Sequence, residues 1–315
     1  MDVSIGFWVG FHALVLVLLA VDLGVFNRKA HAISVREAGI FSAVWISCAL
    51  LFNLFVLISF GPAKGLEFLT GYLIEYSLSV DNIFVFVLVF SAFGVPAKYQ
   101  HRVLFWGILG ALLLRGTLIG VGATLIHQFE WVLYIFGAFL ILAGLRMFMS
   151  HEDPIDLENS RVLKFIRRYI PITSEYHGQK FFILEAGKRV ATPLFMVLIL
   201  VELTDVMFAL DSIPAIFAIT QEPFIVYTSN VFAILGLRSL YFLLAGIIDK
   251  FIYLRFGLAF ILTYVGVKLL LLDIYHIPTL LSLFIIALAL GVSIMASLYV
   301  NQHKEEVKDA VTEGD

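Results

Sequence analysis

Long apolar runs, interrupted at intervals by short polar segments, follow one another along almost the whole chain. An α-helix needs about 20 predominantly apolar residues to cross the hydrocarbon layer of a membrane. The pattern predicts nine such helices, at residues 5–26, 38–60, 68–92, 103–126, 131–149, 193–219, 224–247, 255–275 and 279–301. We interpret the chain as an all-α, polytopic membrane helix bundle in which residues 1–303 form a single transmembrane domain.

The polar segments between these runs predict the remaining organisation. Residues 150–192 form the one long connection, which is predicted to be cytoplasmic. Basic and apolar residues alternate at helical spacing over 161–169, which favours a helix lying on the membrane surface. Residues 180–190 predict a hairpin that turns at Gly187. The charged residues 304–315 lack aromatic side chains and are predicted to form a disordered cytoplasmic tail.

Basic residues alternate between the two sides of the membrane. The segments that follow the odd-numbered helices contain 16 Lys and Arg residues, whereas Lys64 is the basic residue on the opposite side. Cytoplasmic loops carry an excess of Lys and Arg, so this pattern predicts an external N-terminus and a cytoplasmic C-terminus. The first apolar run lacks the pattern of a cleaved signal peptide and is expected to be retained.

Composition narrows the class of protein further. A chain that is 61% hydrophobic and 14% charged departs from soluble domains and is typical of membrane proteins. The single cysteine, Cys48, excludes a disulfide framework and a thiolate metal cluster. Phosphate-binding, dinucleotide-binding and hydrolase motifs do not occur, and basic residues only flank the helices. We therefore predict that the chain is not an enzyme, has no cofactor and does not bind nucleic acid.

Acidic residues stand in the middle of two apolar runs. Glu75 and Asp81 lie six residues apart in LIEYSLSVDNIFVFVLVF, and Asp205 and Asp211 repeat this spacing in LILVELTDVMFALDSIP. Carboxylates within a membrane are costly and usually mark a binding site or an ion pathway. On a regular helix Asp81 and Asp211 point about 120° away from the first acids. The candidate ligands are Glu75, Asp81, Asn82, Glu202, Asp205, Asp211 and Ser212.

The two acidic runs belong to a longer internal repeat. Arg115 in GALLLRG corresponds to Arg238 in AILGLRS, and Arg146 corresponds to Lys268. The two repeats, at about 68–149 and 193–275, contain three predicted spans each, so one repeat must be inverted relative to the other. Inverted repeats with a site near the midplane are typical of secondary transporters. Arg115 and Arg238 are the predicted charge partners of the acids.

Carboxylate, amide and hydroxyl oxygens are hard ligands that suit Mg²⁺, Ca²⁺ or Mn²⁺. The same carboxylates can hold protons when the cation is absent, which is the minimal chemistry of an antiporter. The predicted partners are therefore the lipid bilayer, a divalent cation and protons, and the sequence predicts no oligomeric state. Two alternatives stay open: a membrane scaffold or insertase-like partner that transports nothing, and a cation channel without proton coupling.

Three segments resemble the TerC/Alx family of integral membrane proteins, most closely its Alx branch. They are FLTGYLIEYSLSVDNIFVF, ATPLFMVLILVELTDVMFALDSIPAIFAIT and PFIVYTSNVFAILGLRSLYFLLAG. The family is associated with tellurium resistance and manganese export, so the resemblance implies a bacterial inner-membrane protein that exports Mn²⁺, with Glu75, Asp81, Glu202, Asp205 and Asp211 as functional acids. Tyr76 and Thr204 stand where relatives often have Lys and Ser.

Overall fold

The computed structural model describes residues 3–22, 33–129, 131–149, 171–173, 175–185, 188–245, 251–271, 274–275 and 277–312, without the side chains of 81, 84, 88, 92 and 301–312. Nine α-helices lie in this part of the chain, as predicted. They are α1 (Ile5–Val21), α2 (Val35–Phe60), α3 (Pro62–Ala92), α4 (Ala97–Gln128), α5 (Val132–Met149), α7 (Pro193–Phe217), α8 (Pro223–Leu244), α9 (Leu254–Leu270) and α10 (Thr279–Thr312).

Several helices extend beyond the apolar runs that predicted them. α3 begins at Pro62 rather than near residue 68, because Gly61 at φ +90° ends α2 and Pro62 is suited to the first turn of a new helix. α4 likewise begins directly after Pro96. α10 continues to Thr312, whereas the sequence predicted a disordered tail from residue 304. The segment contains Lys, Glu and Ala, which are good helix formers.

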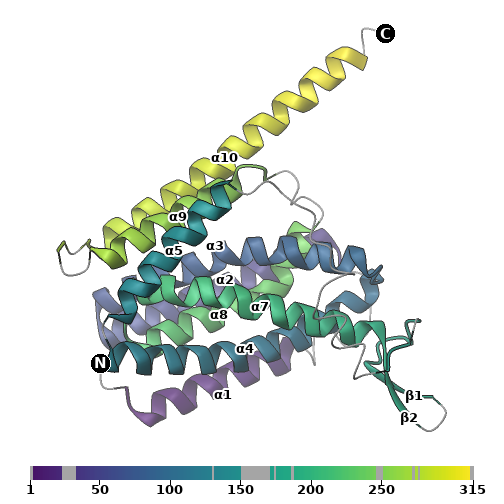
Figure 1. Cartoon of the computed structure of the whole chain (residues 1–315), viewed down its shortest axis with the longest axis horizontal. Helices are drawn as coiled ribbons and strands as arrows, with labels where there is room; N and C mark the ends of the chain where they lie inside the picture. The colour runs from purple at the N-terminus through teal and green to yellow at the C-terminus, as the bar shows by residue number, and fades with distance from the viewer. Residues whose placement is uncertain are drawn as a thin grey trace.

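Seven of the helices in the described residues are long and apolar enough to cross a membrane: α2, α3, α4, α5, α7, α8 and α10. α1 and α9 contain 17 residues each, at the lower limit of the length that spans. The two chain ends lie at opposite ends of the bundle (Figure 1), with the N-terminus beside the start of α1 and the C-terminus beyond α10.

α8 forms the centre of the bundle. It packs against α2, α3 and α4, and 94% of its candidate span is buried, compared with 28% for α2. Polar side chains of α8, among them Asn230 and Arg238, are buried together with its apolar ones. α7 packs between α3 and α4, and α9 packs against α5 and α10 (Figure 1). The elements that surround α8 therefore bring the central parts of α3, α4 and α7 together.

α5 and α9 approach each other through glycines in a reciprocal pattern. A Cβ atom on Gly144 would lie 2.7 Å from the carbonyl oxygen of Ala259, and one on Gly266 would lie 2.7 Å from that of Gly137. The same Cβ atoms would lie 2.9 Å from the amide nitrogens of Thr263 and Ile141, respectively. Small residues allow such close packing of membrane helices. The matched contacts relate these two antiparallel helices by a local two-fold rotation.

This local symmetry involves the helices that contain Arg146 and Lys268, which correspond in the two sequence repeats. An inverted repeat requires such a relation between its equivalent helices. The glycine contacts show this relation for α5 with α9, and its extension to α3 with α7 and α4 with α8 stays a prediction.

The connection before α7 contains the predicted hairpin. β1 (Phe182–Glu185) pairs antiparallel with β2 (Lys188–Ala191), and Phe182 lies opposite Ala191. Tyr176 donates a hydrogen bond of 2.7 Å to the carbonyl oxygen of Phe93, at the end of α3. Partial burial raises the pKa of this tyrosine. The predicted surface helix at 161–169 and the turn residue Gly187 lie outside the described residues.

Replacing Gly266 by valine should destabilise the fold, because the new side chain would meet the backbone of α5. Overpacking of this kind typically costs about 1–3 kcal/mol. Gly291→Val on α10 is the matched control, since a Cβ there meets no heavy atom within 4 Å. The measurement is thermal unfolding of the two purified variants in detergent. Equal melting temperatures would contradict the close α5–α9 contact.

Candidate functional site

Arg115 is the largest fully buried side chain among the described residues, and acids surround it. Its Nε and Nη2 atoms donate hydrogen bonds to the two carboxylate oxygens of Asp205, at 3.1 and 2.7 Å. Its Nη1 atom donates to Glu75 Oε1 and, at 3.3 Å, to the hydroxyl of Ser212. The guanidinium thus binds Asp205 through two parallel hydrogen bonds, the geometry that gives arginine its specificity for carboxylates.

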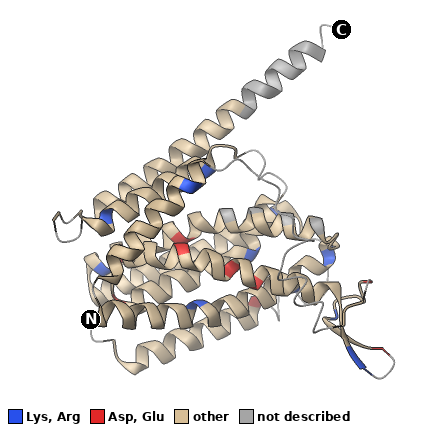
Figure 2. Cartoon of the chain, viewed as in Figure 1, with Lys and Arg blue, Asp and Glu red and all other residues tan. Residues whose placement is uncertain are grey.

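Four helices supply this cluster, and each contributes from its central part. Glu75 lies on α3, Arg115 on α4, Asp205 and Ser212 on α7, and Asn230 on α8. The Asn230 amide donates to Glu75 Oε2 at 2.9 Å. Figure 2 shows acidic and basic positions of this kind inside the bundle, away from its two ends. We call Glu75, Arg115, Asp205, Ser212 and Asn230 the central cluster.

The charges of the central cluster do not cancel. Glu75, Arg115 and Asp205 are 0%, 1% and 3% exposed, respectively. Two carboxylates against one guanidinium leave a formal charge of −1 if both acids are ionised. An uncompensated charge in a dry interior is strongly unfavourable. The cluster therefore favours either one bound proton or an additional cation.

Asp205 and Ser212 stand seven residues apart on α7, which is about two helical turns, so they share one face and both contact Arg115. α7 runs unbroken through Pro214, so Asp211 keeps its rotation away from this face and is only half-buried. The neighbouring helices, rather than a break in α7, bring the other groups to Asp205. The side chain of Asp81 lies outside the described residues.

Three further buried oxygens line the same helices without a hydrogen-bond donor in the described part of the chain. They are Oδ1 of Asn82, Oδ1 of Asn230 and Oε2 of Glu202. The Glu202 carboxylate lies one turn before Asp205 and packs over Gly110, where a Cβ atom would come within 2.0 Å of it. Buried acceptors without a hydrogen-bond donor are unusual in native proteins and call for an explanation such as an ion or water.

Arg238, predicted as a second partner of the repeated acids, lies in a different cluster. Its guanidinium forms an ion pair with Asp22 at the end of α1, and its Nη1 lies 3.3 Å from Nε2 of His101 on α4. A narrow cavity between the two clusters is lined by Asp205 and Arg238 and by apolar residues of α3, α4, α7 and α8. It has room for about one water molecule.

A third polar group lies near the start of α3. Glu67 accepts hydrogen bonds from Lys64, at 2.8 and 3.0 Å, and from the hydroxyl of Thr220. Lys64 also lies 3.7 Å from Glu222 at the start of α8. Eight residues separate Glu67 from Glu75, which corresponds to about 12 Å along a helix.

The predicted ligands are not all gathered at one point. Within the described residues, no three His, Cys, Asp or Glu side chains lie close enough together to hold a metal ion. Glu75 and Asp205 meet through Arg115 instead. The sequence did not predict that Asn230, His101 or Asp22 takes part in these clusters. Asn230 could have been predicted from the sequence, because it is an amide inside an apolar run. The two partners of Arg238 could not, because they depend on how the helices pack.

Comparisons with known proteins agree over most of the chain. The model of the family described as "Integral membrane protein TerC family" matches residues 60–305. An uncharacterized membrane protein of Myxococcus xanthus is 53% identical over 300 residues, which cover 95% of this chain and 94% of that protein. Alx of Escherichia coli, described as a candidate membrane-bound redox modulator, is 46% identical over 308 residues, covering 95% and 96%. No solved structure matches. The chain therefore belongs to the TerC family of integral membrane proteins.

Proposed function

We propose that this protein exports Mn²⁺ from the cytoplasm across the bacterial inner membrane, in exchange for protons. The observation that supports this most directly is the central cluster, where two buried carboxylates share one guanidinium. A site that holds an excess negative charge at membrane depth is suited to bind a cation. The choice of Mn²⁺ among hard cations rests on the resemblance of EYSLSVDN and ELTDVMFALDS to the TerC/Alx motifs.

The donor atoms near the cluster fit such a cation. Carboxylate, amide and hydroxyl oxygens come from Glu75, Asn230, Asp205 and Ser212, and Asn230 has an amide oxygen without a donor. Hard divalent cations prefer oxygen ligands of this kind. Glu202 lies one turn from Asp205 and adds a further carboxylate oxygen that accepts no hydrogen bond in the described residues.

Arg115 has a specific role in this proposal, because it occupies the place between the two acids where a cation would sit. We regard it as a tethered cation that holds the empty site together. A divalent ion binds both carboxylates only if the guanidinium withdraws from at least one of them. When no ion is present, Arg115 together with a proton compensates the acids, so protons and Mn²⁺ use the same oxygens in turn.

A path for the ion follows the polar groups along the bundle. The cavity between Asp205 and Arg238 lies on the side of the predicted cytoplasmic end, and Arg238, which lines it, pairs with Asp22. Glu67, with Lys64 and Thr220, lies on the other side of the central cluster. In this proposal the ion passes from the first group to the central cluster and leaves past the second.

The name of the Alx relative refers to redox modulation, which this chain cannot achieve by forming a disulfide within itself. It has one cysteine, and an intramolecular dithiol cycle needs two. Ion transport by the central cluster needs no thiol.

Neutralising either acid should abolish export while the protein still inserts. In Asp205→Asn or Glu75→Gln, Arg115 keeps one carboxylate partner, so no buried charge is left alone. The site loses its excess charge, and a charged contact worth about 1.5–3 kcal/mol corresponds to at least a tenfold loss. The measurement is Mn²⁺ transport into everted membrane vesicles at matched protein levels. Glu185→Gln on the exposed strand β1 is the control, and wild-type transport by Asp205→Asn would exclude this site.

Removing Arg115 alone should prevent correct folding, whereas removing the whole ionic cluster should restore it. Arg115→Gln leaves two buried carboxylates without their partner, at a cost of about 3–5 kcal/mol. The triple variant Arg115→Gln, Glu75→Gln and Asp205→Asn has no buried charge in the cluster. We expect it to give a monodisperse membrane protein that transports no Mn²⁺. Size-exclusion chromatography and the vesicle assay test the two parts separately. A well-folded, active Arg115→Gln variant would contradict the tethered-cation role.

The affinity for Mn²⁺ should rise with pH. Carboxylates bind the cation in their ionised form, so protons compete at low pH and are released on binding. The checks are Mn²⁺ titrations of the purified protein at several pH values, and calorimetry in buffers of different ionisation enthalpy to count released protons. A pH-independent affinity without proton release would favour a channel-like cation site over an exchanger.

A further inference from the structure

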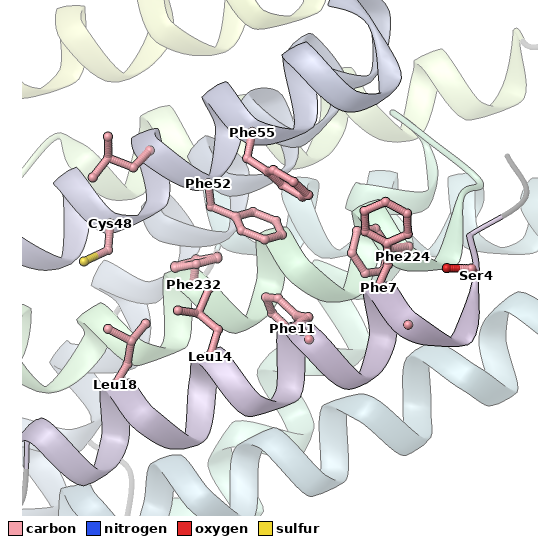
Figure 3. Close-up of a pocket in the computed structure, with 13 residues that line it drawn as sticks. Ser4, Phe7, Phe11, Leu14, Leu18, Cys48, Phe52, Phe55, Phe224 and Phe232 are labelled. Atoms are coloured by element: carbon pink, nitrogen blue, oxygen red, sulfur yellow. The ribbon is translucent and has the colours of Figure 1, made fainter.

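A large apolar groove lies between α1, α2 and α8, and it shares no lining residue with the charged clusters. Its volume is about 580 Å³, within the usual range of about 300–1,000 Å³ for small-molecule sites. Six phenylalanines line it: Phe7, Phe11, Phe52, Phe55, Phe224 and Phe232. Figure 3 shows Phe11 of α1, Phe52 of α2 and Phe232 of α8 lying beside one another at the groove, where the ring centroids of Phe11 and Phe52 are 5.3 Å apart.

The groove has no charged residue in its lining. Ser4 and Cys48 are its polar residues, and the others are apolar side chains or glycines. α2 is a candidate membrane span, and Leu14 and Leu51 at the rim are 40% and 67% exposed. In an integral membrane protein, such a surface faces lipid rather than water. Hydrocarbon is therefore the medium that has access to the groove.

The length of the groove fits a lipid chain. It extends along α1 from Ser4 to Leu18, which is about 21 Å at the helical rise of 1.5 Å per residue. The hydrocarbon core is about 30 Å thick, so one leaflet contributes about 15 Å. An acyl chain from a single leaflet can lie along most of the groove.

Polar and aromatic contacts fix α1 in place beside the groove. His12 Nε2 lies 3.1 Å from the hydroxyl of Tyr227 on α8, and Asp22 pairs with Arg238. The Trp8 ring meets Phe224 edge-on at 5.2 Å. These contacts hold α1 against α8. An unfilled gap along α2 would leave the aromatic walls without contacts on one side, so a ligand that fills it gains dispersion energy.

Gly10 contributes open space to the groove. A Cβ atom at Gly10 would meet no heavy atom within 4 Å, so a larger side chain there can extend into the groove without displacing the backbone. Gly120 on α4 has the same property at membrane depth on another helix. The two glycines form a matched pair for an experiment.

We propose that the α1–α2–α8 groove binds one acyl chain of a membrane phospholipid as a structural ligand. The bilayer surrounds the groove, its walls are aromatic and apolar, and an acyl chain from one leaflet can cover most of its length. The proposal is independent of which ion the central cluster binds, since none of the groove residues belongs to that cluster.

The first test measures the phospholipid that remains bound after purification in a mild detergent, by native mass spectrometry. Wild type and Gly120→Leu should retain a phospholipid, and Gly10→Leu should lose it. Cys48→Leu fills the other end of the groove and serves as a second variant. Equal retention in all four proteins would overturn the proposal. A change from dimer to monomer in Gly10→Leu would also overturn it, because a second copy would then be the occupant.

The second test uses wild-type protein and the single cysteine of the chain. Cys48 lines the groove, so a bound acyl chain should slow its reaction with a small methanethiosulfonate reagent. Delipidated protein should react faster, and adding phospholipid should restore the slow rate. The control places the thiol on the exposed face of α5, as Leu142→Cys in a Cys48→Ser background, where the rate should not respond. A Cys48 rate that phospholipid leaves unchanged would contradict an occupied groove.

Discussion

The buried guanidinium of Arg115 is the interaction on which the centre of this molecule depends. One side chain from α4 joins α3 through Glu75 and α7 through Asp205, and Asn230 adds α8 to the same network. None of these polar groups could be buried alone in a membrane protein without a large desolvation cost. Their mutual hydrogen bonds offset part of this cost and fix how the four helices face each other.

The two halves of the chain use their repeated charges differently. The sequence places Arg115 and Arg238 at corresponding positions, but Arg115 contacts both Glu75 and Asp205, whereas Arg238 pairs with Asp22 of α1. Because α1 lies outside the repeat, its acid introduces an asymmetry. The cluster at the middle of the bundle and the cluster at its end therefore have separate partners and are joined by a narrow cavity.

The sequence predicted much of the architecture and part of the site for physical reasons that can be named. Apolar length predicted nine helices. The cost of charge within a membrane predicted that Glu75, Arg115 and Asp205 belong to the site. Helix starts at Pro62 and Ala97 were missed, because polar helix ends lie outside the apolar signal. The partners of Arg238 and the groove beside α1 could not be predicted, since both depend on side-chain packing between helices that are distant in sequence.

The glycine contacts between α5 and α9 restrict how this protein can change shape. Packed helices often shift by sliding past one another, but that requires an interface without steep steps. Here the backbone oxygens of Ala259 and Gly137 lie where only Gly144 and Gly266 leave room. Sliding by one turn would bring a full side chain against each oxygen, so the pair resists shear and must move as one rigid body.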